Sequence, residues 1–125
     1  MDRQTYLDWC REIPGTTVDQ PFEEDFESYI VRHSDSGKWF AAVFLHDGRD
    51  MVNLKCDPIE SEFLRSVYAG VTPGYHMNKT HWISVWFDSD VPDELLRQLT
   101  LASFRLTDKR RKKPQKEKEN AESQK

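Results

Sequence analysis

Cysteine is scarce in this sequence, which contains only Cys10 and Cys56, well separated along the chain. Two such cysteines do not form the disulfide framework on which small secreted domains depend. No apolar run approaches the roughly 20 residues that a transmembrane helix needs, and no secretory signal is evident. These absences predict a cytoplasmic protein with reduced thiols and no membrane segment.

Recognisable catalytic motifs are also missing. The sequence has no glycine-rich phosphate loop, no nucleophile elbow and no HExxH motif. His76, His81 and Cys56 lack the spacing of a zinc site, and no motif ties a general base to either cysteine. We therefore expect a non-enzymatic protein that needs neither a metal ion nor another cofactor.

Charge is distributed unevenly along the 125 residues, whose formal net charge is −4. Residues 107–125 contain eight of the 18 basic and four of the 22 acidic residues, so residues 1–106 carry a net charge of −8. Large apolar side chains are also absent after residue 106. This composition predicts a folded domain over 1–106 and a disordered, basic and polar tail over 107–125. An acidic domain repels polyanions except where a local patch reverses the sign.

The first half of the chain predicts one helix followed by a β-meander. Apolar residues at helical spacing over 2–13, stopped by Pro14-Gly15, indicate the helix. Segments rich in β-branched and aromatic residues predict strands at 28–33, 38–45 and 50–55. Turn sequences such as Asp47-Gly48 separate these strands, so we expect them to pair antiparallel. The sequence around Thr17 is compatible with one more short strand.

The second half predicts two helices on either side of one strand. Asp57, Pro58 and Glu60 supply a cap, a first-turn proline and a capping-box-like glutamate. The apolar stripe of this helix is predicted to consist of Ile59, Phe63, Leu64, Val67 and Tyr68. A strand follows at 80–87, and Pro92 begins a last helix with a predicted buried stripe of Leu95, Leu99, Ala102 and Leu106. The order α-βββ-α-β-α is typical of an α+β two-layer sandwich with helices on one face of an antiparallel sheet.

The segment 70–87 contains the densest group of polar side chains in the sequence. Between a turn rich in Gly and Pro and an aromatic strand it carries Tyr75, His76, Asn78, Lys79 and His81. If the strands 50–55 and 80–87 are neighbours, Lys55 approaches Lys79. Such groups fit contacts to phosphates, and the Trp82 or Tyr75 ring fits stacking on an unpaired base. The alternative is that these residues cap loop backbone groups and pack the edge of the core.

Two motifs in and before this segment resemble the MmcQ/YjbR family of small bacterial proteins. One is Asn53-Leu54-Lys55-Cys56-Asp57-Pro58, and the other is Pro73-Gly74-Tyr75-His76-Met77-Asn78-Lys79, followed by His81-Trp82. The helix start Val91-Pro92-Asp93-Glu94 fits as well, and the resemblance extends over about residues 1–106. It implies a CyaY-like fold and a role in DNA binding.

Two functions follow as hypotheses, and we expect a monomer in either case. The first is a DNA-binding protein with contacts from Lys55, Tyr75, His76, Asn78, Lys79, His81 and Trp82, and from Lys109, Arg110 and Arg111 in the tail. The basic run at 109–113 predicts weak, salt-sensitive and sequence-independent binding. The second is a protein-interaction or small-ligand module in which the loop 75–81 forms a pocket.

The acidic segment 19–27 permits one more comparison. In frataxin-like proteins an acidic ridge binds iron, and hard cations do prefer clustered carboxylates. A solvated acidic loop is the simpler interpretation of this segment, since fold analogy alone does not establish a function.

Overall fold

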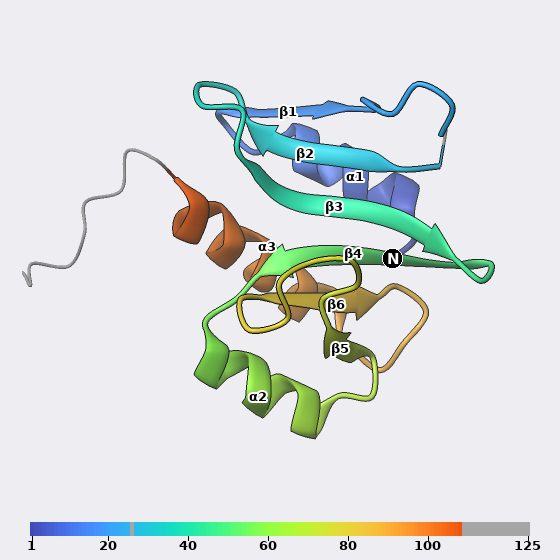
Figure 1. The fold of residues 1–125 in the computed structure, drawn as a ribbon, viewed down its shortest axis with the longest axis vertical. Coiled ribbons are helices and arrows are strands. Elements are labelled where there is room, and N and C mark those ends of the chain that lie inside the picture. The colour runs from blue at the N-terminus through green and yellow to red at the C-terminus, as the bar shows by residue number, and fades with distance from the viewer. Residues whose placement is uncertain (26, 109–125) are drawn as a thin grey trace, which may run out of the picture.

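The computed structural model describes residues 1–25 and 27–108, and this part of the chain forms three helices and six strands. The elements are α1 (Arg3–Arg11), β1 (Thr16–Asp19), β2 (Tyr29–His33), β3 (Trp39–His46), β4 (Arg49–Lys55), α2 (Pro58–Val67), β5 (Val71–Pro73), β6 (Trp82–Trp86) and α3 (Asp93–Thr107). The strands form one antiparallel sheet in the order β1-β2-β3-β4-β6-β5. α1 and α3 lie across one face, and α2 packs beside the edge strand β5 (Figure 1). The predicted α+β fold is therefore confirmed.

Two short strands extend the predicted order to α-ββββ-α-ββ-α. β1 lies where the sequence around Thr17 allowed a strand, and it pairs with β2. β5 was not predicted, because three residues next to a glycine and ending in Pro73 show no periodicity. It pairs with β6 at the outer edge of the sheet. An edge strand tolerates a proline, which has no backbone N–H to donate, because no further strand needs that hydrogen bond. None of the helices in the described segments is both long and apolar enough to cross a membrane.

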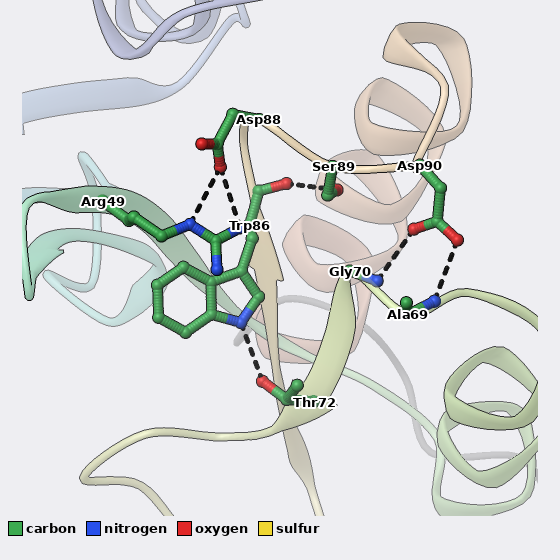
Figure 2. Close-up of a pocket in the computed structure, with 8 residues that line it drawn as sticks. All are labelled: Arg49, Ala69, Gly70, Thr72, Trp86, Asp88, Ser89 and Asp90. Atoms are coloured by element: carbon green, nitrogen blue, oxygen red, sulfur yellow. Dashed lines mark hydrogen bonds and ion pairs between the residues drawn. The ribbon is translucent and has the colours of Figure 1, made fainter.

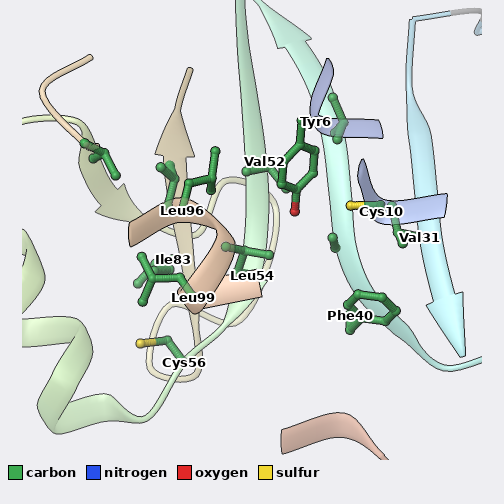
Figure 3. Close-up of a cluster of buried hydrophobic side chains, with 14 of the residues drawn as sticks. Tyr6, Cys10, Val31, Phe40, Val52, Leu54, Cys56, Ile83, Leu96 and Leu99 are labelled. Carbon is green, nitrogen blue, oxygen red and sulfur yellow. The ribbon is translucent and has the colours of Figure 1, made fainter. Parts of the chain in front are cut away.

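The core lies between the sheet and the helices α1 and α3 (Figure 3). Alternate residues of β4 and β6, including Val52, Leu54 and Ile83, point toward these helices and are fully buried. Tyr6 of α1 meets α3 through a hydrogen bond of 2.8 Å between its hydroxyl and that of Thr100. Helices α1 and α3 are thus joined to each other on the same side of the sheet.

The buried stripe of α3 differs from the prediction. The residues that face the sheet are Leu96, Leu99, Thr100, Ser103 and Thr107, whereas Leu95 and Ala102 are half-buried and Leu106 is exposed. Three of these inward positions carry hydroxyl groups, and each hydroxyl is hydrogen-bonded, for example Thr107 to the ring of buried His33. Leu99 was predicted correctly, whereas the three hydroxyl-bearing positions were missed because only apolar residues were counted as inward-facing.

The predicted apolar stripe of α2 is also mostly wrong. Ser61 and Leu64 are its buried residues, and Tyr68 is half-buried. Ile59, Phe63 and Val67 face the solvent instead. The reason lies in the topology: α2 packs mainly against the short edge strand β5, which covers a single narrow side of the helix.

Ser103 provides a test of how α3 is attached to the sheet. The β3–β4 pairing ends at Ala41–Leu54, and beyond it the Ser103 hydroxyl donates to the Phe40 carbonyl and accepts from the Lys55 amide. Ser103→Ala leaves both buried backbone groups without these partners, so we expect a loss of about 1–3 kcal/mol in the free energy of unfolding. Denaturant unfolding measures this loss, with Ser66→Ala on the exposed side of α2 as the control. Equal stability of the two variants would contradict the assigned role.

Candidate nucleic-acid interface

The loop between β5 and β6 folds back across the face of the sheet opposite α1 and α3 (Figure 1). Two fully buried side chains on that face hold its backbone: Asn53 of β4 donates to the Tyr75 carbonyl at 2.7 Å, and Ser84 of β6 accepts from the Tyr75 amide at 2.9 Å. Ser84 also donates to the Asn53 side-chain oxygen. Asn53 and Ser84 are cross-strand partners, so one closed hydrogen-bonded network fixes the loop to the sheet.

Two residues predicted as ligand contacts hold the loop together internally. The Asn78 side chain accepts from the amides of Thr80 and His81, as in an Asx turn. The Lys79 ammonium donates to the Gly74 carbonyl at 2.9 Å, which spans the loop. The Lys79 ammonium therefore points into its own loop. We expected it near Lys55, but it is bonded to the Gly74 carbonyl instead. The interpretation of loop capping fits Asn78 and Lys79 better than direct ligand contact.

Aromatic rings and cations form pairs along this same face. Tyr75 contacts His76 and His46, with ring centroids 3.9 and 4.5 Å apart. The Lys55 ammonium lies 5.9 Å from the centroid of the Trp82 ring, its cross-strand partner. The Arg49 guanidinium lies 4.6 Å from the centroid of the Trp86 ring. We call this set the stacking face, and it consists of His46, Arg49, Lys55, Tyr75, His76, Trp82 and Trp86.

The structure thus brings together only part of the predicted site. Tyr75 pairs with His76, and Lys55 with Trp82. His81 is exposed at the end of the loop, where its carbonyl accepts from the Cys56 amide. The tail residues Lys109, Arg110 and Arg111, and with them the predicted disorder of the tail, lie outside the described residues.

Three members of the stacking face were missed as site residues from the sequence. His46 and Arg49 flank the tight turn between β3 and β4, and a turn sequence was reason enough to set them aside. Strand pairing shows where they lie. Met51 of β4 is opposite Trp86 of β6, and Arg49 is two residues from Met51, so Arg49 is on the same face of the sheet as Met51 and Trp86. That pairing puts Arg49 diagonally beside Trp86.

A surface cavity of about 530 Å³ lies at one end of the stacking face (Figure 2). It is lined by Arg49, Ala69, Gly70, Thr72, Trp86, Asp88, Ser89 and Asp90. Hydrogen bonds from Arg49 hold the pKa of Asp88 below its usual value, and the amides of Gly70 and Ala69 do the same for Asp90. Trp86 lies in this cavity, whereas Tyr75, His76 and Trp82 do not line it. This cavity lies beside the loop 75–81, and the pocket predicted in that loop stays a prediction.

Neither cysteine has the environment of a reactive nucleophile. Burial raises the pKa of the Cys10 thiol to about 12. Burial, followed by the nearby carboxylates of Glu60 and Asp57, raises the pKa of the Cys56 thiol to about 11. Both thiols are therefore protonated at neutral pH, whereas the thiolate is the form that attacks.

Three carboxylates of the acidic segment 19–27 make contacts within the protein, and one of them, Glu27, lies 3.9 Å from the Arg3 guanidinium. Asp19 forms an ion pair with Arg32 of β2, and Asp25 accepts hydrogen bonds from the Ser28 hydroxyl and the Glu27 amide. Within residues 1–25 and 27–108, no three His, Cys, Asp or Glu side chains are grouped so that they could hold a metal ion.

The fold and the two motifs define a class of small α+β proteins in which a polar loop is anchored across an antiparallel sheet. A family model described as YjbR matches residues 11–106, and the chain belongs to the YjbR family. The resemblance found in the sequence motifs is thereby confirmed over most of the folded domain.

Relatives and solved structures agree with this assignment. The chain is 34% identical over 110 residues to the uncharacterised protein YbdF of Escherichia coli O157:H7, covering 85% of this chain and 87% of that protein. It is 32% identical over 117 residues to YyaQ of Bacillus subtilis strain 168, covering 86% and 98%. A crystal structure of a Pseudomonas syringae protein has a TM-score of 0.78 at 32% identity, covering 86% and 99% of the two chains. This likeness establishes family and fold, and function has to be argued from the site.

Asn53 provides a direct test of how the loop is held. Asn53→Ala leaves the Tyr75 carbonyl and the Ser84 hydroxyl without their buried partner, so we expect a loss of about 1–3 kcal/mol in the free energy of unfolding. Hydrogen exchange should also accelerate at the amides of 74–81 while those of α3 stay protected. The matched control is Gln98→Ala, which removes an exposed side-chain amide on α3, outside the loop. Unchanged exchange in the loop of the Asn53 variant would show that other contacts hold it.

The cysteine environments predict slow thiol chemistry. In the folded protein at pH 8, both thiols should react with a disulfide reagent orders of magnitude more slowly than in denaturant. Because the folded pKa of Cys56 is about 11, its reaction rate should continue to rise up to at least pH 10. A rate that levels off near pH 9 would mean that Cys56 has an ordinary, exposed thiol. Stopped-flow absorbance on Cys10→Ser and Cys56→Ser variants separates the two sites.

Proposed function

We propose that this chain is a non-enzymatic DNA-binding protein that uses the stacking face together with the basic run 109–113. The observation that carries the proposal is the placement of two cation–ring pairs, Lys55 with Trp82 and Arg49 with Trp86, on one face with the exposed His76. Proteins that bind single strands combine aromatic platforms for bases with cations that follow the backbone. Unpaired bases are therefore the expected target of this face.

Any attraction of a polyanion to the acidic domain has to come from local cations on the stacking face. Outside the helices and their caps, residues 1–106 contain ten acidic and five basic residues, so the sheet and its loops are also negative as a whole. The three lysines of residues 1–106 are Lys38, Lys55 and Lys79, all in the sheet or its loops. Of these three, Lys55 lies on the stacking face beside Trp82, so it is the lysine that supplies a local site for a polyanion there.

We expect the basic run 109–113 to supply most of the affinity for DNA and the stacking face to position the bases. Each phosphate neutralised on a duplex adds about −0.9 to the slope of log affinity against log salt, and about −0.7 on a single strand. The five basic residues 109–113 can therefore supply a slope of about −4 to −5 on duplex DNA, and Lys55 about −0.9 more. Truncation after Thr107 should remove most of the affinity.

Fluorescence anisotropy with a labelled single strand and the matching duplex tests this division. We expect the full chain to bind both at low salt, with the single strand preferred. In the truncated chain, Lys55→Ala should weaken the remaining binding, whereas Lys38→Ala, the same change outside the stacking face, should not. Tyr75→Ala should reduce single-strand affinity while leaving the loop in place, because Ser84 and Asn53 hold only the Tyr75 backbone. If neither the full nor the truncated chain binds at low salt, the proposal is wrong.

A second candidate function rests on the cavity beside Trp86. Its volume of about 530 Å³ lies in the range of ligand sites, about 300–1,000 Å³, and an indole ring lies in its wall. A small ligand there would be expected to quench Trp86 fluorescence and to depend on Arg49 but not on Lys55. Binding of a small ligand that Arg49→Ala abolishes and Lys55→Ala leaves intact, without DNA binding, would favour this candidate.

A further inference from the structure

The outward face of α2 exposes three large apolar side chains in one line. Ile59, Phe63 and Val67 are 79%, 62% and 50% exposed, more than any other large apolar residue in the described part of the chain. They are spaced four residues apart, so they follow one side of the helix over its whole length. Single exposed apolar residues are common, but a contiguous group of this kind marks an interaction surface.

Acidic residues flank this apolar line on both sides. At about 100° per residue, Glu60 and Glu62 fall on opposite edges of the stripe. The single basic residue of α2, Arg65, turns away, since its guanidinium donates to the Ser61 hydroxyl, which is buried on the packed side. The outward face of α2 is therefore apolar along its centre and negative along its margins.

These properties exclude several occupants. The segment 109–125 carries the right charge but contains no large apolar side chain to cover Phe63. A second copy would bring another negatively charged α2 face against Glu60 and Glu62, with no cations on that face to pair with them. An anionic lipid surface would be repelled by Glu60 and Glu62 at the edges of the apolar line.

We propose that the outward face of α2 docks an amphipathic helix of another protein. The apolar side chains of that helix would cover Ile59, Phe63 and Val67, and its lysine or arginine residues would pair with Glu60 and Glu62. Helix-on-helix docking through anchors at this spacing is a recurring mode of recognition. The surface is independent of the stacking face, because α2 lies beyond β5 at the edge of the sheet (Figure 1).

The probe for this surface is a synthetic amphipathic helical peptide of leucine and lysine, titrated into the ¹⁵N-labelled full chain. We expect amide shifts concentrated in α2, and about tenfold weaker binding by Phe63→Ser, since a buried phenylalanine contributes that much or more. Leu101→Ser, at an exposed position of α3, is the matched control and should bind like the unsubstituted chain. The double variant Glu60→Lys, Glu62→Lys should no longer bind the leucine–lysine peptide. It should bind a helical peptide of leucine and glutamate more tightly than the unsubstituted chain does.

Several outcomes would overturn this proposal. Shifts that map outside α2, or equal affinity of Phe63→Ser and Leu101→Ser, would show that the stripe binds no helix. Sedimentation that reveals self-association abolished by Phe63→Ser would assign the face to a second copy of the chain. Binding to phosphatidylcholine vesicles that depends on Phe63 would assign it to lipid. Thermal unfolding of each variant establishes that it is folded, which is expected because all four substituted positions are exposed.

Discussion

The hydrogen bonds that join Asn53, Ser84 and the backbone of Tyr75 are the interaction on which the rest of the site depends. They lie at the centre of the sheet face that carries no helix, and both side chains are fully buried. Burying an amide and a hydroxyl is costly unless each is hydrogen-bonded, and here the two side chains bond to each other and to the backbone of the loop. The loop therefore replaces a second layer of helices, and it brings the rings of Tyr75 and His76 to the surface.

Local signals in the sequence were sufficient to predict most elements of the fold. Asp57 does cap α2 with its side chain, accepting from the amides of Ile59 and Glu60, and the strands of the meander pair as expected. Such signals act between residues close in the chain, so they can be recognised without the fold. β5 escaped prediction because only its pairing with β6 makes it a strand.

The faces of the helices and the make-up of the site depend on contacts across the fold, which explains the errors. Thr100, Ser103 and Thr107 are buried because Tyr6, Phe40 and His33 offer partners from distant elements. Phe63 is exposed because the sheet ends beside α2. Likewise, Lys55 lies beside the ring of Trp82, whereas Lys79 donates to the Gly74 carbonyl of its own loop. Hydrophobicity alone does not contain this information.

The strand order has a practical consequence for anyone who wishes to transplant the site. β6 inserts between β4 and β5, so the surface is composed of two chain segments separated by α2. A peptide covering residues 70–87 would carry Tyr75, His76 and both tryptophans, but it would lack the Asn53 anchor and the cations of β4. Grafting this surface onto another scaffold therefore requires the β3–β4 hairpin as well, in register with β6. The smallest portable unit is a piece of sheet and not a loop.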